Sequence, residues 1–181
     1  MALEAPEGFV DGQTEPWIVD ILCALLKASD QRNVLECGAF LGHTTVRLAE
    51  VLAANGGGTI TAVEIDPARA QAADELLHQR FLQNDRTDFH WRIIQDDVLK
   101  YIASIPDESL GYAWIDDSHE HEHVDKEIQL LLPKVAPNGL LLFHDVHGVC
   151  ELHREVERYG GIALDLPRLG PAGGLGIIQV R

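Results

Sequence analysis

Acidic and histidine side chains gather at two places in the second half of the chain. Asp116 begins the run Asp-Asp-Ser-His, which ends at His119, and His144 is followed directly by Asp145. Each group comes directly after a short apolar segment of the kind that forms a buried strand. Because parallel strands end at one edge of a sheet, carboxylates there could bind a hard divalent cation, and an imidazole could accept a proton from a substrate.

A glycine-containing pattern lies nearer the start, where residues 33–45 read N-V-L-E-C-G-A-F-L-G-H-T-T. Gly38 breaks an apolar run that continues at helical spacing, which predicts a strand, a glycine turn and a helix. Such a turn presents free backbone N–H groups where open α/β sheets bind small ligands. Phe40 stands where a dinucleotide turn needs a bare glycine, so a nicotinamide oxidoreductase is disfavoured. Glu36 would repel phosphate but suits a ligand that carries an ammonium and a sulfonium.

Two further acidic positions follow predicted strands. Glu64 ends a strand rich in β-branched residues, roughly 20 residues past the glycine turn, where a doubly wound nucleoside site places an acid on the ribose hydroxyls. Asp96 and Asp97 follow the next predicted strand, and either could instead serve as the N-cap of the helix that begins at residue 98. The acids therefore predict a nucleoside site, with helix capping as the alternative for the aspartate pair.

Strands and helices alternate along the chain until a closing hairpin. Helices are expected at 14–26, about 46–52, 67–82, 98–104, 120–132 and 148–159, and strands at 34–37, 59–64, 89–94, 110–115, 140–143, 162–166 and 175–180. This order predicts an α/β, Rossmann-like doubly wound sheet of seven mostly parallel strands, with an antiparallel last strand and helices on both faces. No linker or repeat interrupts it, so residues 1–181 are expected to form one domain, with 1–13 as an irregular arm and the first helix on the sheet edge.

Composition restricts the partners. The 181 residues include 29 acidic and 14 basic ones, for a net charge of −15 without a basic cluster, which disfavours nucleic acid. No apolar run approaches the roughly 20 residues that span a bilayer, and no signal-peptide pattern is visible. Cys23, Cys37 and Cys150 lie in apolar patterns typical of reduced thiols. We therefore expect a cytoplasmic protein that acts on a small molecule, without a membrane partner; a homodimer is compatible with the sequence.

Two motifs carry a resemblance to a known family. The pattern E-x-G-x-x-x-G resembles the first motif of class I S-adenosylmethionine-dependent methyltransferases, and V-L-E-C-G-A-F-L-G-H-T-T is most similar to the catechol O-methyltransferase type. The order I-D-D-S-H, helix, L-P-x-x-x-P-N-G-L-L-L-F-H-D-V resembles the metal-dependent O-methyltransferases related to the macrocin and mycinamicin enzymes. The resemblance covers residues 13–180 and implies methyl transfer from S-adenosylmethionine to a hydroxyl of a small molecule.

The resemblance also implies a role for each position. The cofactor would be bound by Glu36, Gly38 and Gly42 at its methionine part, by Glu64 at the ribose, by Asp97 or its neighbour Asp96 at the adenine, and by Asp116. A divalent metal, Mg²⁺ or Mn²⁺, would be held by Asp116, His144 and Asp145. His144 replaces an acid usual in the magnesium enzymes, which shifts the preference toward Mn²⁺, Fe²⁺ or Zn²⁺. His119 matches the position of the base and would accept the hydroxyl proton.

Two alternatives from other classes remain open. The run His-Glu-His-Glu-His at residues 119–123 also suggests a zinc hydrolase that binds metal through H-x-H-x-D-H. In an extended segment the three histidines would share a face, but in a helix His121 turns about 200° away from His119. The second alternative is a non-catalytic nucleoside-cofactor-binding protein, because only the arm and the turn at 170–174 could cover a pocket.

Overall fold

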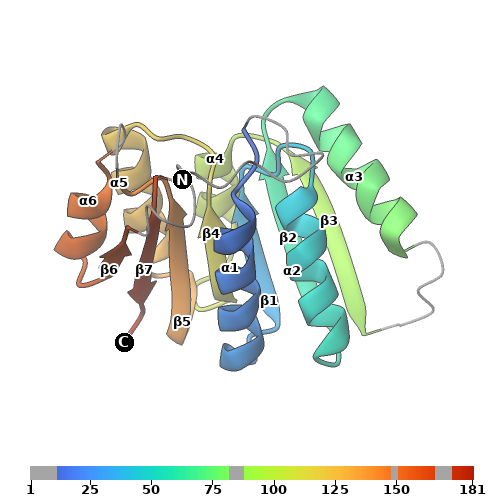
Figure 1. Ribbon diagram of the computed structural model, residues 1–181, viewed down its shortest axis with the longest axis horizontal. Helices are drawn as coiled ribbons and strands as arrows, with labels where there is room; N and C mark the ends of the chain where they lie inside the picture. The colour runs from blue at the N-terminus through green and yellow to red at the C-terminus, as the bar shows by residue number, and fades with distance from the viewer. Residues whose placement is uncertain (1–11, 82–87, 148–150, 166–172) are drawn as a thin grey trace, which may run out of the picture.

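The computed structural model describes residues 12–81, 88–147, 151–165 and 173–181, and within them seven strands form one sheet (Figure 1). The strands are β1 (Asn33–Cys37), β2 (Gly58–Glu64), β3 (Phe89–Gln95), β4 (Leu110–Ile115), β5 (Val135–His144), β6 (Ile162–Leu164) and β7 (Leu175–Gln179). Their order is β3-β2-β1-β4-β5-β7-β6, and only β7 is antiparallel to its neighbours. The expected Rossmann-like, mostly parallel sheet with an antiparallel last strand is therefore confirmed.

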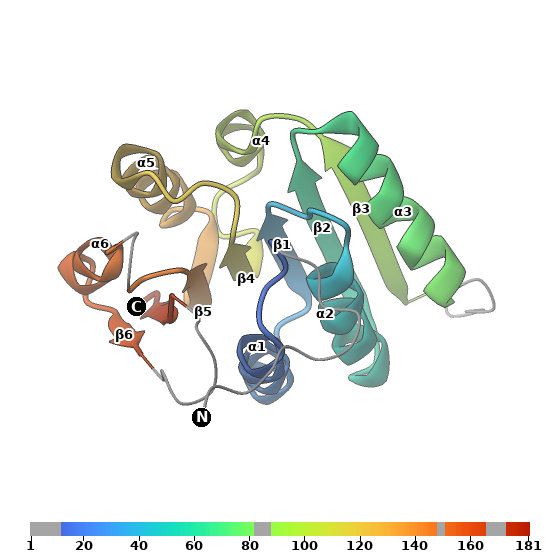
Figure 2. The ribbon, with the colours of Figure 1, turned by 45° about the horizontal axis from the view of Figure 1, so that its top comes forward.

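Helices cover both faces of this sheet. They are α1 (Pro16–Ser29), α2 (His43–Ala54), α3 (Pro67–Phe81), α4 (Val98–Ser104), α5 (His121–Leu131) and α6 (His153–Arg158). Apolar side chains of α4, α5 and α6 pack in one core cluster with Leu35 and Leu141, whereas α1, α2 and α3 pack in another with Val34 and Leu142 (Figure 2). Successive strand residues thus face opposite helical layers, as a sheet buried on both faces requires.

Most predicted elements agree with the observed ones to within a few residues. The expected turn at 137–139 lies inside β5, where Asn138 has a φ of +69°. Residues 1–11 of the arm, 148–150 of the expected last helix, which include Cys150, and 170–172 of the expected covering turn lie outside the described residues. None of the helices in the described ranges has both the length and the apolar character needed to cross a bilayer.

The expected position of the first helix is wrong, because α1 covers the middle of the sheet and not its edge. Ile18 and Leu22 pack in the same cluster as Trp114 of β4 and Leu142 of β5. The hydroxyl of Tyr112, also in β4, donates a hydrogen bond to the carbonyl of Leu22 at 2.9 Å. An amphipathic stripe predicts that a helix is half-buried, but it carries no information on which strands the helix covers.

The glycine turn after β1 packs directly on the end of β4. Gly38 has a φ of +88°, and a Cβ atom there would collide with the backbone carbonyl of Asp116. The N–H of Asp116 in turn donates to the carbonyl of Cys37 at 2.9 Å. The strand order reverses between β1 and β4, which is where open sheets bind ligands. The space left by Gly38 is therefore needed by the protein itself, and not only by a ligand.

The contact at Gly38 can be tested against a glycine that lacks it. Gly160 has a similar φ of +79°, but a Cβ there would meet no atom within 4 Å. Both Gly38→Ala and Gly160→Ala should carry the left-handed cost of about 1–2 kcal/mol, and Gly38→Ala an additional overlap cost of about 1–3 kcal/mol. Urea unfolding of the two variants measures the difference. Equal losses would mean that Gly38 is only a turn residue.

Candidate active site

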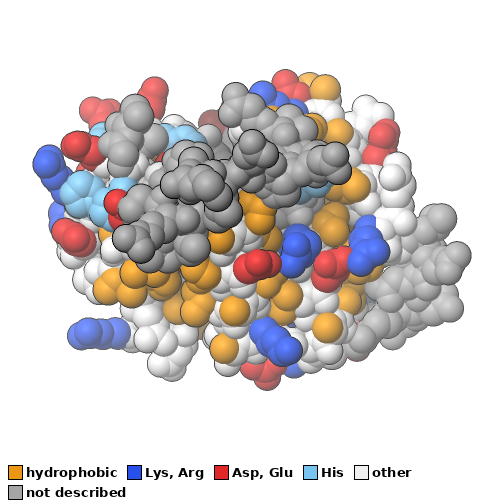
Figure 3. All heavy atoms as spheres, viewed as in Figure 1, with side chains coloured by type: hydrophobic (Ala, Val, Ile, Leu, Met, Phe, Trp, Pro, Cys, Tyr) orange, Lys and Arg blue, Asp and Glu red, His pale blue; other side chains and the backbone are white. Residues whose placement is uncertain are grey.

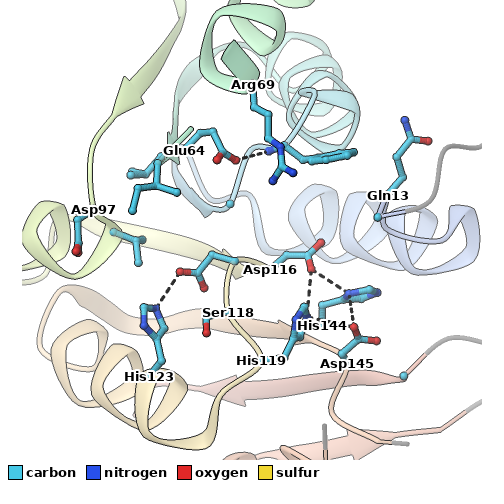
Figure 4. Close-up of a pocket in the computed structure, with 18 of the residues that line it drawn as sticks. Gln13, Glu64, Arg69, Asp97, Asp116, Ser118, His119, His123, His144 and Asp145 are labelled. Atoms are coloured by element: carbon cyan, nitrogen blue, oxygen red, sulfur yellow. Dashed lines mark hydrogen bonds and ion pairs between the residues drawn. The ribbon is translucent and has the colours of Figure 1, made fainter. Parts of the chain in front are cut away.

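A cavity of about 850 Å³ lies at the carboxyl ends of β1 to β5 (Figure 4). This volume is within the range of about 300–1,000 Å³ that is usual for small-molecule sites. Its lining includes Gln13, Glu15, Gly38, Phe40, Glu64, Ile65, Arg69, Asp96, Asp97, Asp116, Asp117, His119, His123, His144 and Asp145. The structure thus brings together every site residue expected from the sequence except Glu36 and Gly42.

The carboxylate of Glu64 is held at the cavity wall by two backbone N–H groups. Oε2 accepts a hydrogen bond from Phe40 at 2.8 Å, and Oε1 accepts one from Asp66 at 3.0 Å. These bonds connect the acid at the end of β2 to the glycine turn after β1. The two motifs that were found separately in the sequence therefore form one unit, and ribose binding by Glu64 stays a prediction.

Three side chains around Glu64 form an apolar and cationic wall. Phe40 has a φ of +47°, so it takes up the left-handed conformation that a glycine would adopt in a dinucleotide turn. The guanidinium of Arg69 lies 4.8 Å from the centre of its ring. Ile65 lines the cavity with 68% of its surface exposed, and neither it nor Arg69 was singled out from the sequence. An apolar residue directly after the acid of β2 was the signal that could have indicated a flat apolar ligand group.

The aspartate pair after β3 has divided roles. Asp97 is the N-cap of α4, because its Oδ1 accepts from the N–H of Lys100 at 3.2 Å. Oδ1 of Asp96 accepts from the N–H of Asp97 at 2.8 Å. The capping alternative is thus observed for Asp97. Since a carboxylate has two oxygens, capping is compatible with ligand binding, and the predicted adenine contact stays open for both residues.

Glu36 lies behind the main cavity. It is 1% exposed and faces an adjacent small pocket of about 30 Å³, which it shares with Gly38 and Asp116. Its Oε2 has no hydrogen-bond partner among the described residues. Burial, reinforced by the charges of Asp116 and Glu64, raises the pKa of Glu36 to about 8. A cation that reached this pocket would therefore find an acid without a counter-charge.

Gly42 is part of a helix contact and not of the cavity wall. It is the N-cap of α2 with a φ of +81°, and a Cβ there would lie 2.9 Å from the Cα of Ala73 in α3. The close approach of α2 and α3 accounts for glycine at this position. The structure shows Gly42 outside both pockets, so its expected contact with a cofactor stays untested.

His144 joins three carboxylates at the end of β5. Its Nδ1 lies 2.9 Å from Oδ1 of Asp116 and 3.5 Å from Oδ2 of Asp145, and its Nε2 lies 2.7 Å from Oε2 of Glu15. Burial opposes the charged imidazole, but the hydrogen bonds to Asp116 and Glu15 outweigh it and raise the pKa of His144 to about 10. His144 is therefore an imidazolium at neutral pH, with both nitrogens engaged.

His119 lies between two of these carboxylates. Its Nε2 is 3.1 Å from Oδ2 of Asp145 and 3.8 Å from Oδ1 of Asp116, without hydrogen-bond geometry. One ligand-type atom from each of Asp116, His119 and His144 lies within 4.8 Å of the other two. Asp145 reaches both imidazoles and has a φ of +51°, a strained conformation of the kind found at functional sites. The expected trio of Asp116, His144 and Asp145 meets here, and His119 is beside it.

The alternating histidine run does not form a common metal-binding face. Nδ1 of His121 lies 3.0 Å from Oε1 of Glu155 in α6. Nε2 of His123 lies 2.9 Å from Oδ2 of Asp117, whereas His119 turns toward Asp145. Because α5 begins at His121, the run is split between a loop and a helix. The geometry therefore disfavours the zinc-hydrolase alternative.

Thr14 and Glu15 join the site although neither was singled out from the sequence. Oγ1 of Thr14 donates to Oδ2 of Asp116 at 2.7 Å, across 102 residues of sequence, and Glu15 contacts His144 across 129 residues. Burial opposes ionisation of Glu15, but its hydrogen bond with His144 lowers its pKa. A polar pair before a helix resembles an ordinary helix start, so only the fold reveals these partners.

Comparison with protein families gives one match over most of the described sheet. Residues 35–146, more than half of the chain, match the model of a family described as a methyltransferase domain. None of the curated proteins compared with the chain matches it.

Solved structures with the same fold include three methyltransferases. An O-methyltransferase from Bacillus cereus, in complex with SAH, is 20% identical with a TM-score of 0.73, and the match covers 95% of this chain and 84% of that one. The O-methyltransferase TomG from Streptomyces achromogenes, involved in tomaymycin synthesis and in complex with SAM, is 16% identical with a TM-score of 0.72, covering 94% and 82%. SAH-bound PaMTH1 from Podospora anserina is 14% identical with a TM-score of 0.73, covering 94% and 81%. At these identities the likeness shows a common fold.

The contacts of His144 predict a pH-dependent stability. A histidine whose pKa rises from 6.5 to about 10 on folding stabilises the protein fully below pH 6.5, and this contribution falls with rising pH until it is lost above 10. In chelator-treated protein, His144→Gln should therefore lower the free energy of unfolding strongly at pH 7 and little above pH 10. Urea unfolding measures both values, with His121→Gln as the control for an exposed histidine. A loss independent of pH would contradict the imidazolium assignment.

Proposed function

The chain belongs to the methyltransferase-domain family, and we propose that it transfers a methyl group from S-adenosylmethionine to a hydroxyl oxygen of a small molecule, aided by a divalent metal and by His119 as base. One observation carries this proposal. A single cavity has a nucleoside-type wall around Glu64 at one end and a corner of carboxylates and imidazoles around His144 at the other, so a nucleoside donor and an oxygen acceptor could bind next to each other.

The residues at the Glu64 end of the cavity fit a cationic nucleoside cofactor. S-adenosylmethionine, when bound, supplies a methyl group on a positively charged sulfur. Glu64 presents a carboxylate already oriented by two N–H groups, and Ile65 and Phe40 offer apolar surface for a base. One oxygen of Glu36, which lines the adjacent small pocket, has no hydrogen-bond partner in the part of the chain that the structure describes, and it could accept the ammonium of the methionine part. These acids support a cation and disfavour a pyrophosphate cofactor.

The residues at the His144 end of the cavity fit a divalent metal. Asp116, His144 and Asp145 offer two carboxylates and an imidazole, a donor set suited to Mn²⁺ and Zn²⁺ as well as Mg²⁺. A metal there would act as a Lewis acid that lowers the pKa of the acceptor hydroxyl. His144 can ligate through Nδ1 only after it gives up the proton on that nitrogen, so binding should be favoured by rising pH.

His119 is the proposed base. His119 lines the cavity, and its imidazole would take the proton of the hydroxyl while the oxygen bonds to the methyl carbon and the carbon–sulfur bond breaks. Oδ2 of Asp145, at 3.1 Å, would then stabilise the imidazolium. The residues of the site mainly hold the two reactants in line, which is the principal task in a displacement of this kind.

We propose a small molecule as the acceptor, no nucleic-acid partner and a cytoplasmic location. On the face in Figure 3, the Lys and Arg side chains are scattered and lie near acidic ones. Among the ion pairs of the protein, Arg47 pairs with Asp20 and Arg80 with Glu50. Such alternating charges offer little attraction to a polyanion. The thiols of Cys23 and Cys37 are free, as is usual in a reducing compartment. Calorimetric titration with S-adenosylmethionine and with NADH separates the proposed class from an oxidoreductase, since only the first should bind.

The ribose assignment predicts the effect of Glu64→Gln. Loss of the charge-assisted hydrogen bonds should weaken the binding of S-adenosylmethionine by about 1–3 kcal/mol, as measured by calorimetry. Glu75→Gln, at an exposed position of α3, is the control and should bind normally. An unchanged affinity in Glu64→Gln would remove this residue from the ribose site.

The proposed metal site predicts different effects for Asp145→Ala and His119→Ala. With an acceptor found by screening small hydroxylated molecules, a chelator should stop turnover but leave cofactor binding nearly unchanged. Asp145→Ala should abolish turnover and remove the contribution of this site to the rise in melting temperature that Mn²⁺ causes in the wild-type protein. His119→Ala should retain that rise but lower kcat by about 10²–10⁴-fold, as expected for a base that is not a ligand.

The matched control is His121→Ala, because His121 is an exposed neighbour that pairs with Glu155 away from the cavity. It should retain both activity and the response to Mn²⁺. Full activity in excess chelator, together with no bound metal by elemental analysis, would refute the proposed role of a metal in the reaction. If His119→Ala lost the thermal response to Mn²⁺, His119 would be a ligand instead of the base.

A further inference from the structure

A second group of ligand-type side chains lies at the wall of the cavity, and none of the proposed steps uses it. Nε2 of His123 lies 2.9 Å from Oδ2 of Asp117 and 3.7 Å from Oε2 of Glu127. One donor atom from each of these residues falls within 4.8 Å of the other two. Asp117 follows β4, whereas His123 and Glu127 are one turn apart on α5. The group therefore spans the junction between a strand end and a helix.

Glu127 is the unusual member of this group. Its side chain is 0% exposed, and its neighbours on α5, Val124, Ile128 and Leu131, belong to the apolar core. Neither carboxyl oxygen of Glu127 has a hydrogen-bond partner of regular geometry among the described residues, and the same holds for Oδ1 of Asp117. The Cys37 thiol and the Asp117 carboxyl are close enough to Glu127 to affect its pKa. A buried carboxylate whose charge is not compensated costs several kcal/mol, which favours the binding of a proton or a positive ion here.

A proton compensates only part of the negative charge. Burial, followed by the charge and the hydrogen bond of Asp117, raises the pKa of Glu127 well above its usual range, against an opposing hydrogen bond from the Cys37 thiol, so a proton is the alternative to a cation in this group. One proton neutralises one of the two carboxylates. A divalent ion would neutralise both and would also use the imidazole of His123, and such a mixture of nitrogen and oxygen donors favours Zn²⁺, Co²⁺ or Mn²⁺ over Mg²⁺ and Ca²⁺.

We propose that Asp117, His123 and Glu127 form a second divalent-cation site, which takes a first-row transition ion such as Zn²⁺. The site is separate from the proposed catalytic corner. In Figure 4, His123 and His119 lie on opposite sides of Ser118, and the contacts of His144 run to Asp116 and not to Asp117. The proposal does not depend on methyl transfer, because the site could be present in a methyltransferase and in a non-catalytic cofactor-binding protein alike.

An ion in this position would support the active-site wall. Asp117 belongs to the loop that also carries Asp116 and His119, and His123 lies in the first turn of α5. Ligation would tie this loop to the helix at the point where the sheet ends. The ion would thus hold the segment that presents both the candidate base and a candidate ligand.

Zn²⁺ binding to the chelator-stripped full chain tests the proposal. The background variant is Asp145→Ala, which removes a proposed ligand of the first metal site. Equilibrium dialysis with elemental analysis then counts the ions that remain bound. In this background, Glu127→Gln and His123→Gln should each weaken Zn²⁺ binding by at least about 10–100-fold, the range known for groups that only support a ligand. His121→Gln, on the same helix but outside the group, should bind as the background does.

A second readout separates a site from a packing role. Without metal, Glu127→Gln should be as stable as the background or more stable, because it removes a buried ionisable group. With Zn²⁺, the melting temperature should rise in the background and in His121→Gln but not in Glu127→Gln or His123→Gln. If the background binds no Zn²⁺, or if the two variants bind it with unchanged affinity, the group only shares protons and the proposal is overturned. His123→Gln, at a partly exposed position, carries the test should Glu127→Gln fail to fold.

Discussion

The crowding of carboxylates at one edge of the sheet is the constraint on which the rest of this structure depends. Glu64, Asp116 and Asp145 lie at the ends of β2, β4 and β5 in a chain whose net charge is −15. Like charges this close would raise the free energy of the folded state unless each had a donor or a cation nearby. The fold provides these partners locally, as backbone N–H groups for Glu64 and as the His144 imidazolium for Asp116 and Asp145.

The same constraint bears on the proposed reaction. The cavity contains more acidic than basic side chains, so a methyl donor that carries a sulfonium would be bound more favourably than the product, which has lost that positive charge. Glu36 is the clearest case, because one of its oxygens has no hydrogen-bond partner among the described residues and burial raises its pKa to about 8. A ligand that brings a cation to this edge would therefore be stabilised by acids that the folded protein alone does not neutralise.

The sequence was most informative where local patterns decide the structure. Apolar runs predicted the strands, and acids directly after those runs predicted which side chains would meet, because parallel strands share an edge. Contacts across long separations could not be predicted in this way. Glu15 before α1 resembled a helix start, and its contact with His144 depends on α1 lying over the centre of the sheet. Glu127 sits at a buried position of α5 where a pattern of apolar residues alone would leave no reason to expect a carboxylate.

The position of β7 between β5 and β6 has a consequence for synthesis on the ribosome. Among the described strands, β6 pairs with β7 alone, and β7 also covers the outer edge of β5. Leu175–Gln179 is nevertheless the last of these seven strands to leave the ribosome. Until then β5, which contains the apolar residues Leu140 and Leu142, has an unpaired edge. Such edges can pair with strands of other chains. The nascent chain therefore passes through a stage in which the sheet stays unfinished, and chaperones that shield strand edges would act most usefully at that moment.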